Sequence, residues 1–241
     1  MRIGLASFLC RNRDVPFNMS QIERAMREAQ GKKVDLLCFG EAYLQGFDSL
    51  CWDYAVDKAM ALELGSETIC QLRQWSKAYG TALLTGYIER EGECLYSSCA
   101  VIEDGELLCN YRRITKGWKE YWRTDEHYKE GSETGKFTFH NREIRLALCG
   151  DLWDCPEKFK TEHLLIWPVY VNFTVDEWNS REMDAYARQA SLAAEHVLMV
   201  NPIDYEPRNH GGSFYFRNGK IIDRLPFDQE GILVVDVDDI V

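Results

Sequence analysis

The sequence contains the stretch Leu146-Ala147-Leu148-Cys149-Gly150-Asp151-Leu152-Trp153. Its apolar opening predicts the end of a buried strand, and Cys149-Gly150-Asp151 predicts a sharp exit from that strand. A thiol is then expected at the carboxyl edge of a sheet, where α/β proteins bind their ligands. The alternative is an inert buried thiol, because a free Cys packs like a small hydrophobe. The other segments of the chain decide between these interpretations.

Composition narrows the class of protein. The chain has 241 residues, of which 46% are hydrophobic, and a formal net charge of −11 at pH 7. This acidity argues against nucleic acid or an anionic membrane as the main partner, because both need basic patches. No apolar run approaches the roughly 20 residues that cross a bilayer. We expect a single domain over residues 1–241.

The cysteines indicate the redox compartment. There are nine, an odd number, and the chain leads at once from Met1 into a strand-like segment rather than a secretory leader. Reduced thiols in a cytoplasm are the simplest interpretation. No C-x-x-C pair is present, so a structural zinc site is not expected.

Apolar periodicity and turn residues predict a layered α/β fold. Residues 2–8 and 34–39 read as strands around a helix that begins near Asn18 or Ser20 and ends at Gly31. The Asp104-Gly105 turn makes the following strands antiparallel, so the sheet is mixed. Further strands are expected at residues 81–88, 96–102, 107–111, 137–139, 144–148, 164–167, 197–200, 212–216, 220–222 and 231–237. A helical region with a break at Gly65-Ser66 is expected at 54–79, and a helix at 178–196.

A polar and aromatic segment, residues 112–135, separates two of these strands. Loops of this length are usually functional or disordered. Trp118, Tyr121 and Trp122 argue against disorder. With Trp153 they either line an aromatic pocket or pack the loop onto the sheet, since aromatic side chains dominate cores.

Three strand ends carry groups that form a chemically sensible set. Glu41 follows the strand at 34–39, Arg113 and Lys116 follow the strand at 107–111, and Cys149 follows the strand at 144–148. A thiolate is a strong nucleophile, and a neighbouring carboxylate can take the thiol proton and later activate water. A cation can stabilise the oxyanion of a tetrahedral intermediate.

These segments and several later ones together resemble the carbon–nitrogen hydrolase (nitrilase) superfamily over nearly the whole chain. Residues 39–47, Phe-Gly-Glu-Ala-Tyr-Leu-Gln-Gly-Phe, resemble the family segment F-P-E, spacer, G-Y. Residues 148–151, Leu-Cys-Gly-Asp, resemble I-C-Y-D. Further matches are Ala187-Arg188, Ala194-Glu195, Val200-Asn201, Gly212-Ser213, Asn218-Gly219 and Glu230-Gly231-Ile232.

The resemblance implies a four-layer αββα sandwich with two mixed β-sheets, often paired through its helices into a homodimer. It implies Glu41 as general base, Cys149 as nucleophile, and neither a metal nor an organic cofactor. The expected reaction is hydrolysis of a non-peptide C–N bond in a small amide or carbamoyl compound, and less readily in a nitrile, through a thioester.

The third catalytic position departs from the family pattern. The family lysine sits in Y-R-K, whereas this chain reads Tyr111-Arg112-Arg113. Either Lys116 supplies the ammonium from a shifted loop, which we favour, or Arg113 takes the electrostatic role with a guanidinium that keeps its proton. The departure also motivates an alternative, a nitrilase-fold binding module that has lost catalysis.

Other candidates contact the substrate or compete for the nucleophile's role. Asp125-Glu126-His127 resembles a D-E-H segment of the family, so Glu126 is expected to position substrate together with Arg113 and Trp153. Cys155 takes the place of an apolar residue in F-P-E and is not expected to be the nucleophile. A Cys–His hydrolase is disfavoured because none of the five histidines lies in a catalytic segment.

Overall fold

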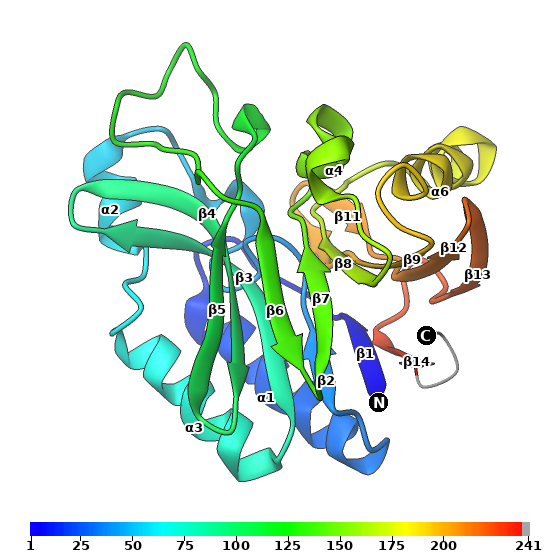
Figure 1. The fold of residues 1–241 in the computed structure, drawn as a ribbon. Coiled ribbons are helices and arrows are strands. Elements are labelled where there is room, and N and C mark those ends of the chain that lie inside the picture. Colours follow the sequence, from blue (N-terminus) through cyan, green and yellow to red (C-terminus); the bar gives the residue numbers. More distant parts are fainter. Residues whose placement is uncertain (238–241) are drawn as a thin grey trace.

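Two six-stranded sheets face each other in the computed structural model, and helices cover their outer faces (Figure 1). The structure describes residues 1–237. The first sheet has the order β14-β1-β2-β3-β4-β5: Gly231–Asp236, Arg2–Ser7, Leu36–Cys38, Ala82–Glu91, Cys94–Glu103 and Glu106–Arg112. The second has the order β13-β12-β9-β8-β7-β6: Lys220–Arg224, Phe214–Arg217, His196–Val200, Leu164–Pro168, Arg142–Leu146 and Gly135–Phe139.

Both sheets are mixed and share one pattern of strand directions. From β14 to β5 the neighbours are antiparallel, parallel, parallel, antiparallel and antiparallel. From β6 to β13 the same sequence of directions recurs. Apolar side chains from both sheets form a shared core, with Leu36 and Leu84 on one side and Leu146 and Ile166 on the other. The predicted αββα sandwich is therefore confirmed.

Each sheet has its own helices. On the first sheet, α1 (Val15–Gly31) and α3 (Glu67–Tyr79) pack side by side, and the short α2 (Tyr54–Met60) comes between them in the chain. On the second sheet, α6 (Met183–Ala190) packs on β12 and β13. The shorter helical segments are Phe47–Ser49, Lys116–Trp118, α4 (Asp151–Asp154), Pro156–Phe159, α5 (Val175–Glu177) and a π-helical turn at Trp178–Glu182.

Two helices differ from their predicted bounds. The first begins at Val15 because the Asp14 side chain accepts a hydrogen bond from the backbone N–H of Phe17 at 3.1 Å, as an N-cap does. Asn18 is instead a buried side chain inside the helix. The helix predicted over 178–196 contains the π-helical turn and ends at Ala190, and β9 already begins at His196. The alanine-rich apolar period continues in the sequence beyond Ala190, although the chain has already left the helix there.

The sequence pattern did not predict the structure of two further segments. A short hairpin, β10 (Ile203–Tyr205) with β11 (Arg208–His210), has strands of only three residues, too short for a clear apolar period. The predicted long loop is ordered by contacts: the buried Asp57 carboxylate accepts a hydrogen bond from Tyr128 Oη at 2.8 Å, and Arg123 Nη2 donates to the backbone carbonyl of Cys51 at 2.9 Å.

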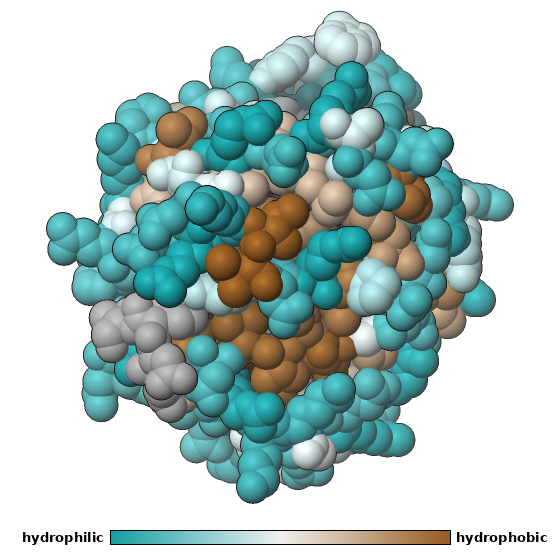
Figure 2. Space-filling model, turned by 90° about the vertical axis from the view of Figure 1, so that its right-hand side faces the viewer, coloured by the Kyte–Doolittle hydropathy of each residue, from teal (hydrophilic) through white to brown (hydrophobic). Residues whose placement is uncertain are grey.

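The outer surface gives two more observations. Within residues 1–237, no helix is long and apolar enough to cross a membrane. The face that carries β13 and α6 shows apolar surface interrupted by polar side chains (Figure 2). Ile222 on β13 is one of the exposed apolar side chains.

Candidate active site

Glu41 is held just beyond the end of β2 and is fully buried. Its backbone N–H donates to the carbonyl of Val169 in the other half of the sandwich at 3.2 Å. Its segment lies against Gly86 of β3, where a Cβ would come within 2.7 Å of the Glu41 Cα. Oε1 accepts hydrogen bonds from Ser97 Oγ at 2.8 Å and from Arg113 Nη1 at 3.0 Å. Oε2 has no hydrogen-bond partner within the described residues.

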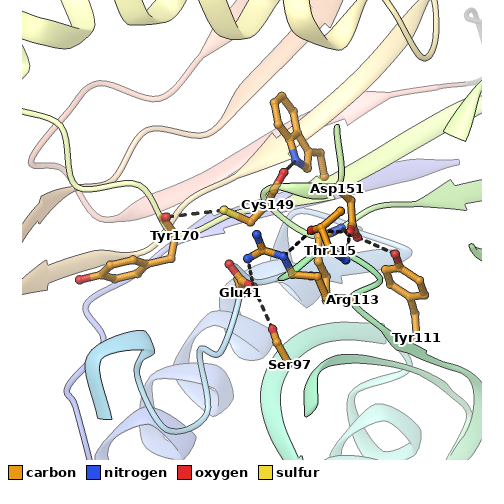
Figure 3. Close-up of polar contacts among 10 residues, drawn as sticks. Glu41, Ser97, Tyr111, Arg113, Thr115, Cys149, Asp151 and Tyr170 are labelled. Atoms are coloured by element: carbon orange, nitrogen blue, oxygen red, sulfur yellow. Dashed lines mark hydrogen bonds and ion pairs between the residues drawn. The ribbon is translucent and has the colours of Figure 1, made fainter. Parts of the chain in front are cut away.

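Arg113 is the residue after β5, and its side chain is 3% exposed. Its backbone N–H donates to the Ser97 carbonyl at 2.9 Å, so it extends the pairing of β5 with β4. In the side chain, Nε donates to Thr115 Oγ1 at 2.9 Å and Nη1 donates to Glu41. Nη2 donates to no group within residues 1–237. The guanidinium therefore lies between Glu41 and the strand end that carries Cys149 (Figure 3).

Cys149 follows β7 in a left-handed backbone conformation, with φ of 41°. Its N–H donates to the carbonyl of Pro168 at 2.9 Å, and its carbonyl accepts from Trp167 Nε1 at 2.8 Å. The sulfur lies 3.9 Å from the backbone oxygen of Tyr170 (Figure 3). Left-handed geometry is uncommon for a residue other than Gly, Asn or Asp, and such strain clusters at functional sites.

Asp151 fixes the geometry between the two strand ends. Its buried carboxylate accepts four hydrogen bonds: Oδ1 from the Thr115 N–H at 3.1 Å and the Thr115 hydroxyl at 2.9 Å, and Oδ2 from Tyr111 Oη at 2.5 Å and the Leu148 N–H at 2.9 Å. Because Thr115 in turn accepts from Arg113, Asp151 connects the segment of Cys149 to the Arg113 guanidinium (Figure 3).

Charge and burial act on the thiol in opposite directions. Burial and then the negative charge of Glu41 raise the pKa of Cys149, and the positive charge of Arg113 lowers it, with a resulting pKa of about 12. The thiol is therefore protonated at neutral pH and needs a base before it can attack. Burial alone would lower the pKa of Arg113, but the negative charge of Glu41, and then that of Asp151, raises it above its ordinary value.

The sequence matches the carbon–nitrogen hydrolase family over residues 3–154, which is more than half of the chain. The chain belongs to the carbon–nitrogen hydrolase family. Membership supports a hydrolase that acts on C–N bonds.

Two characterised relatives are similar in sequence. A glutamine-dependent NAD(+) synthetase from Thermotoga maritima is 24% identical over 248 residues, which cover 99% of this chain and 42% of the relative. An arylacetone-specific nitrilase from Alcaligenes faecalis is 26% identical over 113 residues, 43% of this chain and 32% of the relative. The chain thus matches less than half the length of each relative.

Solved structures share the fold. An amidase from Nesterenkonia sp. superposes with a TM-score of 0.77 at 21% identity and covers 98% of this chain and 89% of the amidase. XC1258 from Xanthomonas campestris, a CN-hydrolase superfamily protein with an arsenic adduct in its active site, gives 0.77 at 18% identity with the same coverage. A variant of the Nesterenkonia amidase carries acrylamide on its active-site cysteine, with a TM-score of 0.78 at 20% identity over 99% of this chain and 94% of that one.

The structure brings some of the predicted site residues of this family member together and separates others. Glu41, Arg113 and Cys149 lie in one cluster (Figure 3). Lys116 is exposed, in the short helical turn after the strand, with Nζ 5.6 Å from the centroid of the Tyr121 ring. The cation that pairs with Glu41 is therefore Arg113, and the shifted-lysine interpretation has no support from the geometry.

The predicted substrate-contacting residues occupy different environments. Glu126 is exposed on the loop. Trp153 is partly exposed on α4 and meets the Tyr186 ring edge-on at 5.0 Å. Trp118 is buried and packs near Tyr128, which fits the packing alternative. The other two aromatic residues of the loop, Tyr121 and Trp122, are exposed, the latter by 81%.

Sequence reasoning missed the groups that hold the catalytic candidates in place. Ser97 and Thr115 each bond one of them, and Tyr111 anchors Asp151. Asp151 stood in the opening stretch, two residues after the cysteine, and a buried-strand exit that ends on Asp is a signal for a carboxylate that binds nearby N–H groups. Ser97 and Thr115 carried no comparable signal.

Proposed function

We propose that this chain hydrolyses a non-peptide C–N bond, in an amide or carbamoyl compound, through a thioester on Cys149. Glu41 is the general base and Arg113 is the cation. The observation that carries the proposal is Glu41 Oε2, a buried carboxylate oxygen without a hydrogen-bond partner among residues 1–237, in the cluster that also holds Cys149 and Arg113. Buried polar groups are nearly always hydrogen-bonded, so this oxygen supports the binding of a further group, the substrate, in the site.

Acylation uses Cys149 as nucleophile, Arg113 as the oxyanion's partner, and Glu41 first as base and then as acid. The Cys149 thiol, protonated at neutral pH, gives its proton to Glu41 while the sulfur bonds to the substrate carbonyl carbon. The carbonyl oxygen becomes an oxyanion, which Arg113 Nη2 stabilises. Glu41 then returns the proton to the nitrogen, the C–N bond breaks, and ammonia or an amine leaves.

Deacylation repeats the proton transfers with water. Glu41 accepts a proton from a water molecule while the water oxygen bonds to the thioester carbon. Arg113 stabilises the second oxyanion. The C–S bond breaks, the thiolate recovers the proton from Glu41, and the acid departs. The cycle needs no metal and no organic cofactor.

The test is turnover combined with intact-mass measurement. The purified chain is assayed for ammonia release on a panel of small amides, carbamoyl compounds and nitriles, and glutamine is included because one relative is named for its dependence on it. We expect turnover of at least one amide and an acyl adduct after acid quenching. Cys149→Ala removes both, whereas Cys70→Ala, at an exposed thiol outside the site, changes neither.

A binding module without catalysis is the second candidate. Two observations favour it: the family lysine is replaced by Arg113, and burial raises the pKa of the thiol. This candidate gives no turnover on any member of the panel and no covalent adduct, while the fold stays intact by circular dichroism. The adduct on Cys149 therefore discriminates between the two candidates.

We also propose a cytoplasmic, single-domain homodimer. Nine free cysteines support a reducing compartment. Apolar surface on the face of β13 and α6 supports pairing through that side of the sandwich (Figure 2). Light scattering of the purified chain should give twice the chain mass of 28.0 kDa. A mass equal to one chain at micromolar concentration contradicts the dimer.

A further inference from the structure

The guanidinium of Arg113 lies against a residue that has no side chain. An ideal Cβ on Gly150 would be 2.1 Å from Nη2 and 3.2 Å from Cζ of Arg113. Gly117 flanks the same nitrogen, since a Cβ there would be 2.9 Å away. Such short separations lie well inside van der Waals contact, so any side chain at residue 150 would overlap the guanidinium.

The backbone does not explain the glycine at position 150. Gly150 has φ of −62° and ψ of −11°, in the right-handed helical region that every L-residue adopts. The residue in the left-handed region is its neighbour Cys149, which is not a glycine. The backbone conformation that favours glycine therefore occurs at Cys149 and not at residue 150. The remaining physical reason for glycine at position 150 is the lack of space for a side chain.

The guanidinium cannot move aside at low cost. Nη1 is bonded to the buried Glu41 carboxylate, and Nε is bonded to Thr115. Thr115 is itself fixed by two hydrogen bonds to Asp151. A rotation that frees space for a Cβ at position 150 would break charged hydrogen bonds inside the protein, where an unpaired charge is expensive.

We propose that Gly150 is a positioning residue for Arg113, and that its missing side chain is what allows this site to use an arginine as the cation beside Cys149. The proposal rests on the proposed role of Arg113 in catalysis. It gives one explanation for two differences from the family motifs: the arginine in the lysine register, and glycine where I-C-Y-D has tyrosine. Lysine is a point charge without the planar fork that occupies this space.

The same geometry selects the nitrogen that meets the substrate. Nε donates to Thr115 and Nη1 to Glu41, whereas Nη2 donates to no group among the described residues and lies against Gly150. Gly150 directly follows the nucleophile in the chain. The space over its Cα therefore places the free donor nitrogen at the segment where the oxyanion forms.

A double-mutant cycle tests the pair. Gly150→Ala, Arg113→Lys and the double variant are compared with the parent chain in steady-state kinetics and in denaturant unfolding, with Gly31→Ala as a matched control because a Cβ there meets nothing within 4 Å. In the parent background we expect Gly150→Ala to lower kcat by about 100-fold with KM changed by less than about threefold. In the Arg113→Lys background the same change should alter kcat by less than about threefold.

The unfolding arm separates this proposal from the proposed function. We expect Gly150→Ala to lower the unfolding midpoint in the parent background and to leave it unchanged or raise it in the Arg113→Lys background. This coupling can be measured even if no amide is turned over. A lack of turnover would contradict only the catalytic role of Arg113, and the steric pairing with Gly150 would still be tested. If Gly150→Ala has equal effects on kcat and on the unfolding midpoint in both backgrounds, the proposed coupling of Gly150 to Arg113 is wrong.

A folding failure of Gly150→Ala is also informative. If the variant does not fold, Gly150→Ala is combined with Arg113→Ala, which removes the guanidinium. Recovery of the folded state supports the steric pair. Failure of the double variant to fold, while Arg113→Ala alone folds, contradicts it.

Discussion

Two groups of residues near the strand ends differ in how firmly the fold holds them. The first, which we call the buried group, is Glu41, Arg113 and Asp151 with the half-buried Cys149; the outer group is Lys116, Tyr121, Trp122, Glu126 and Trp153. Members of the buried group lie within a few residues of the ends of β2, β5 and β7, and hydrogen bonds link the segments of the two sheets there. Members of the outer group are exposed side chains on a loop or on α4.

The difference shows where charge is useful for catalysis. Arg113 and Lys116 are three residues apart, yet one is buried in an ion pair and the other lies in water over an aromatic ring. A fixed cation in a buried site stabilises a developing charge far more than a hydrated one. The buried group should therefore control activity, and the outer group should change it only slightly.

The largest effect is expected at Glu41. Glu41→Gln keeps the shape but removes the base, and we expect kcat on a turned-over amide to fall by about 10²- to 10⁴-fold. It also leaves Arg113 without its buried counter-charge, so the free energy of unfolding should drop by about 3 kcal/mol in urea denaturation. Glu126→Gln is the matched exposed carboxylate. Equal losses in the two variants would erase the distinction between the groups.

Asp151 tests whether the buried group depends on its anchor. Asp151→Asn replaces a carboxylate that accepts four hydrogen bonds with an amide that must turn its NH₂ toward two of those donors. We expect a loss of about 1–3 kcal/mol in the free energy of unfolding and a fall in kcat of about 10- to 100-fold. Full activity in this variant would show that Arg113 needs no fixed position.

The pH dependence of the thiol tests the electrostatics of the buried group. The pKa of Cys149 is raised to about 12, so in the free protein its alkylation rate by a small uncharged reagent should increase about tenfold per pH unit from pH 7 to 10 without a plateau. Because Glu41 raises this pKa and Arg113 lowers it, Glu41→Gln should speed alkylation and Arg113→Ala should slow it. Peptide mass spectrometry follows Cys149 separately from the other thiols. A plateau below pH 9 contradicts the burial effect.

The smallest effects are expected in the outer group. Trp122→Ala and Glu126→Gln alter exposed side chains, so the free energy of unfolding should change by no more than about 0.5 kcal/mol. We expect kcat/KM to stay within about threefold of the parent value. A rise of about tenfold or more in KM for either variant would show that the loop contacts the substrate, as the sequence predicted for Glu126.

The sequence placed Glu41 and Cys149 of the buried group at strand ends for a physical reason, but it favoured Lys116 over Arg113 and missed the anchoring role of Asp151. Glu41 and Cys149 follow apolar runs that end on short turn segments, and the backbone of a strand fixes where its next residue points. Arg113 also carried a signal, because it lies two positions after the buried Tyr111 and shares its face of the strand. Lys116 lies beyond the strand, where no period fixes side-chain direction.

Other features depended on contacts distant in sequence. The end of the helix at Ala190 and the β10–β11 hairpin are set by packing that an alanine-rich or polar stretch does not encode. The hydrogen bonds from Ser97 and Thr115 join residues that only the folded sheet brings together. Gly150 was visible in the sequence, but its relation to Arg113 required the position of the guanidinium.

The central claim is that Arg113, and not Lys116, is the cation that serves Cys149. The most direct test is chemical rescue: Arg113→Ala and Lys116→Ala are assayed on a turned-over amide with and without millimolar guanidinium. We expect Arg113→Ala to lower kcat by about 10²- to 10³-fold and guanidinium to restore part of it saturably, with Lys116→Ala within about threefold of the parent and unaffected. Retained activity in Arg113→Ala together with its loss in Lys116→Ala would contradict the account.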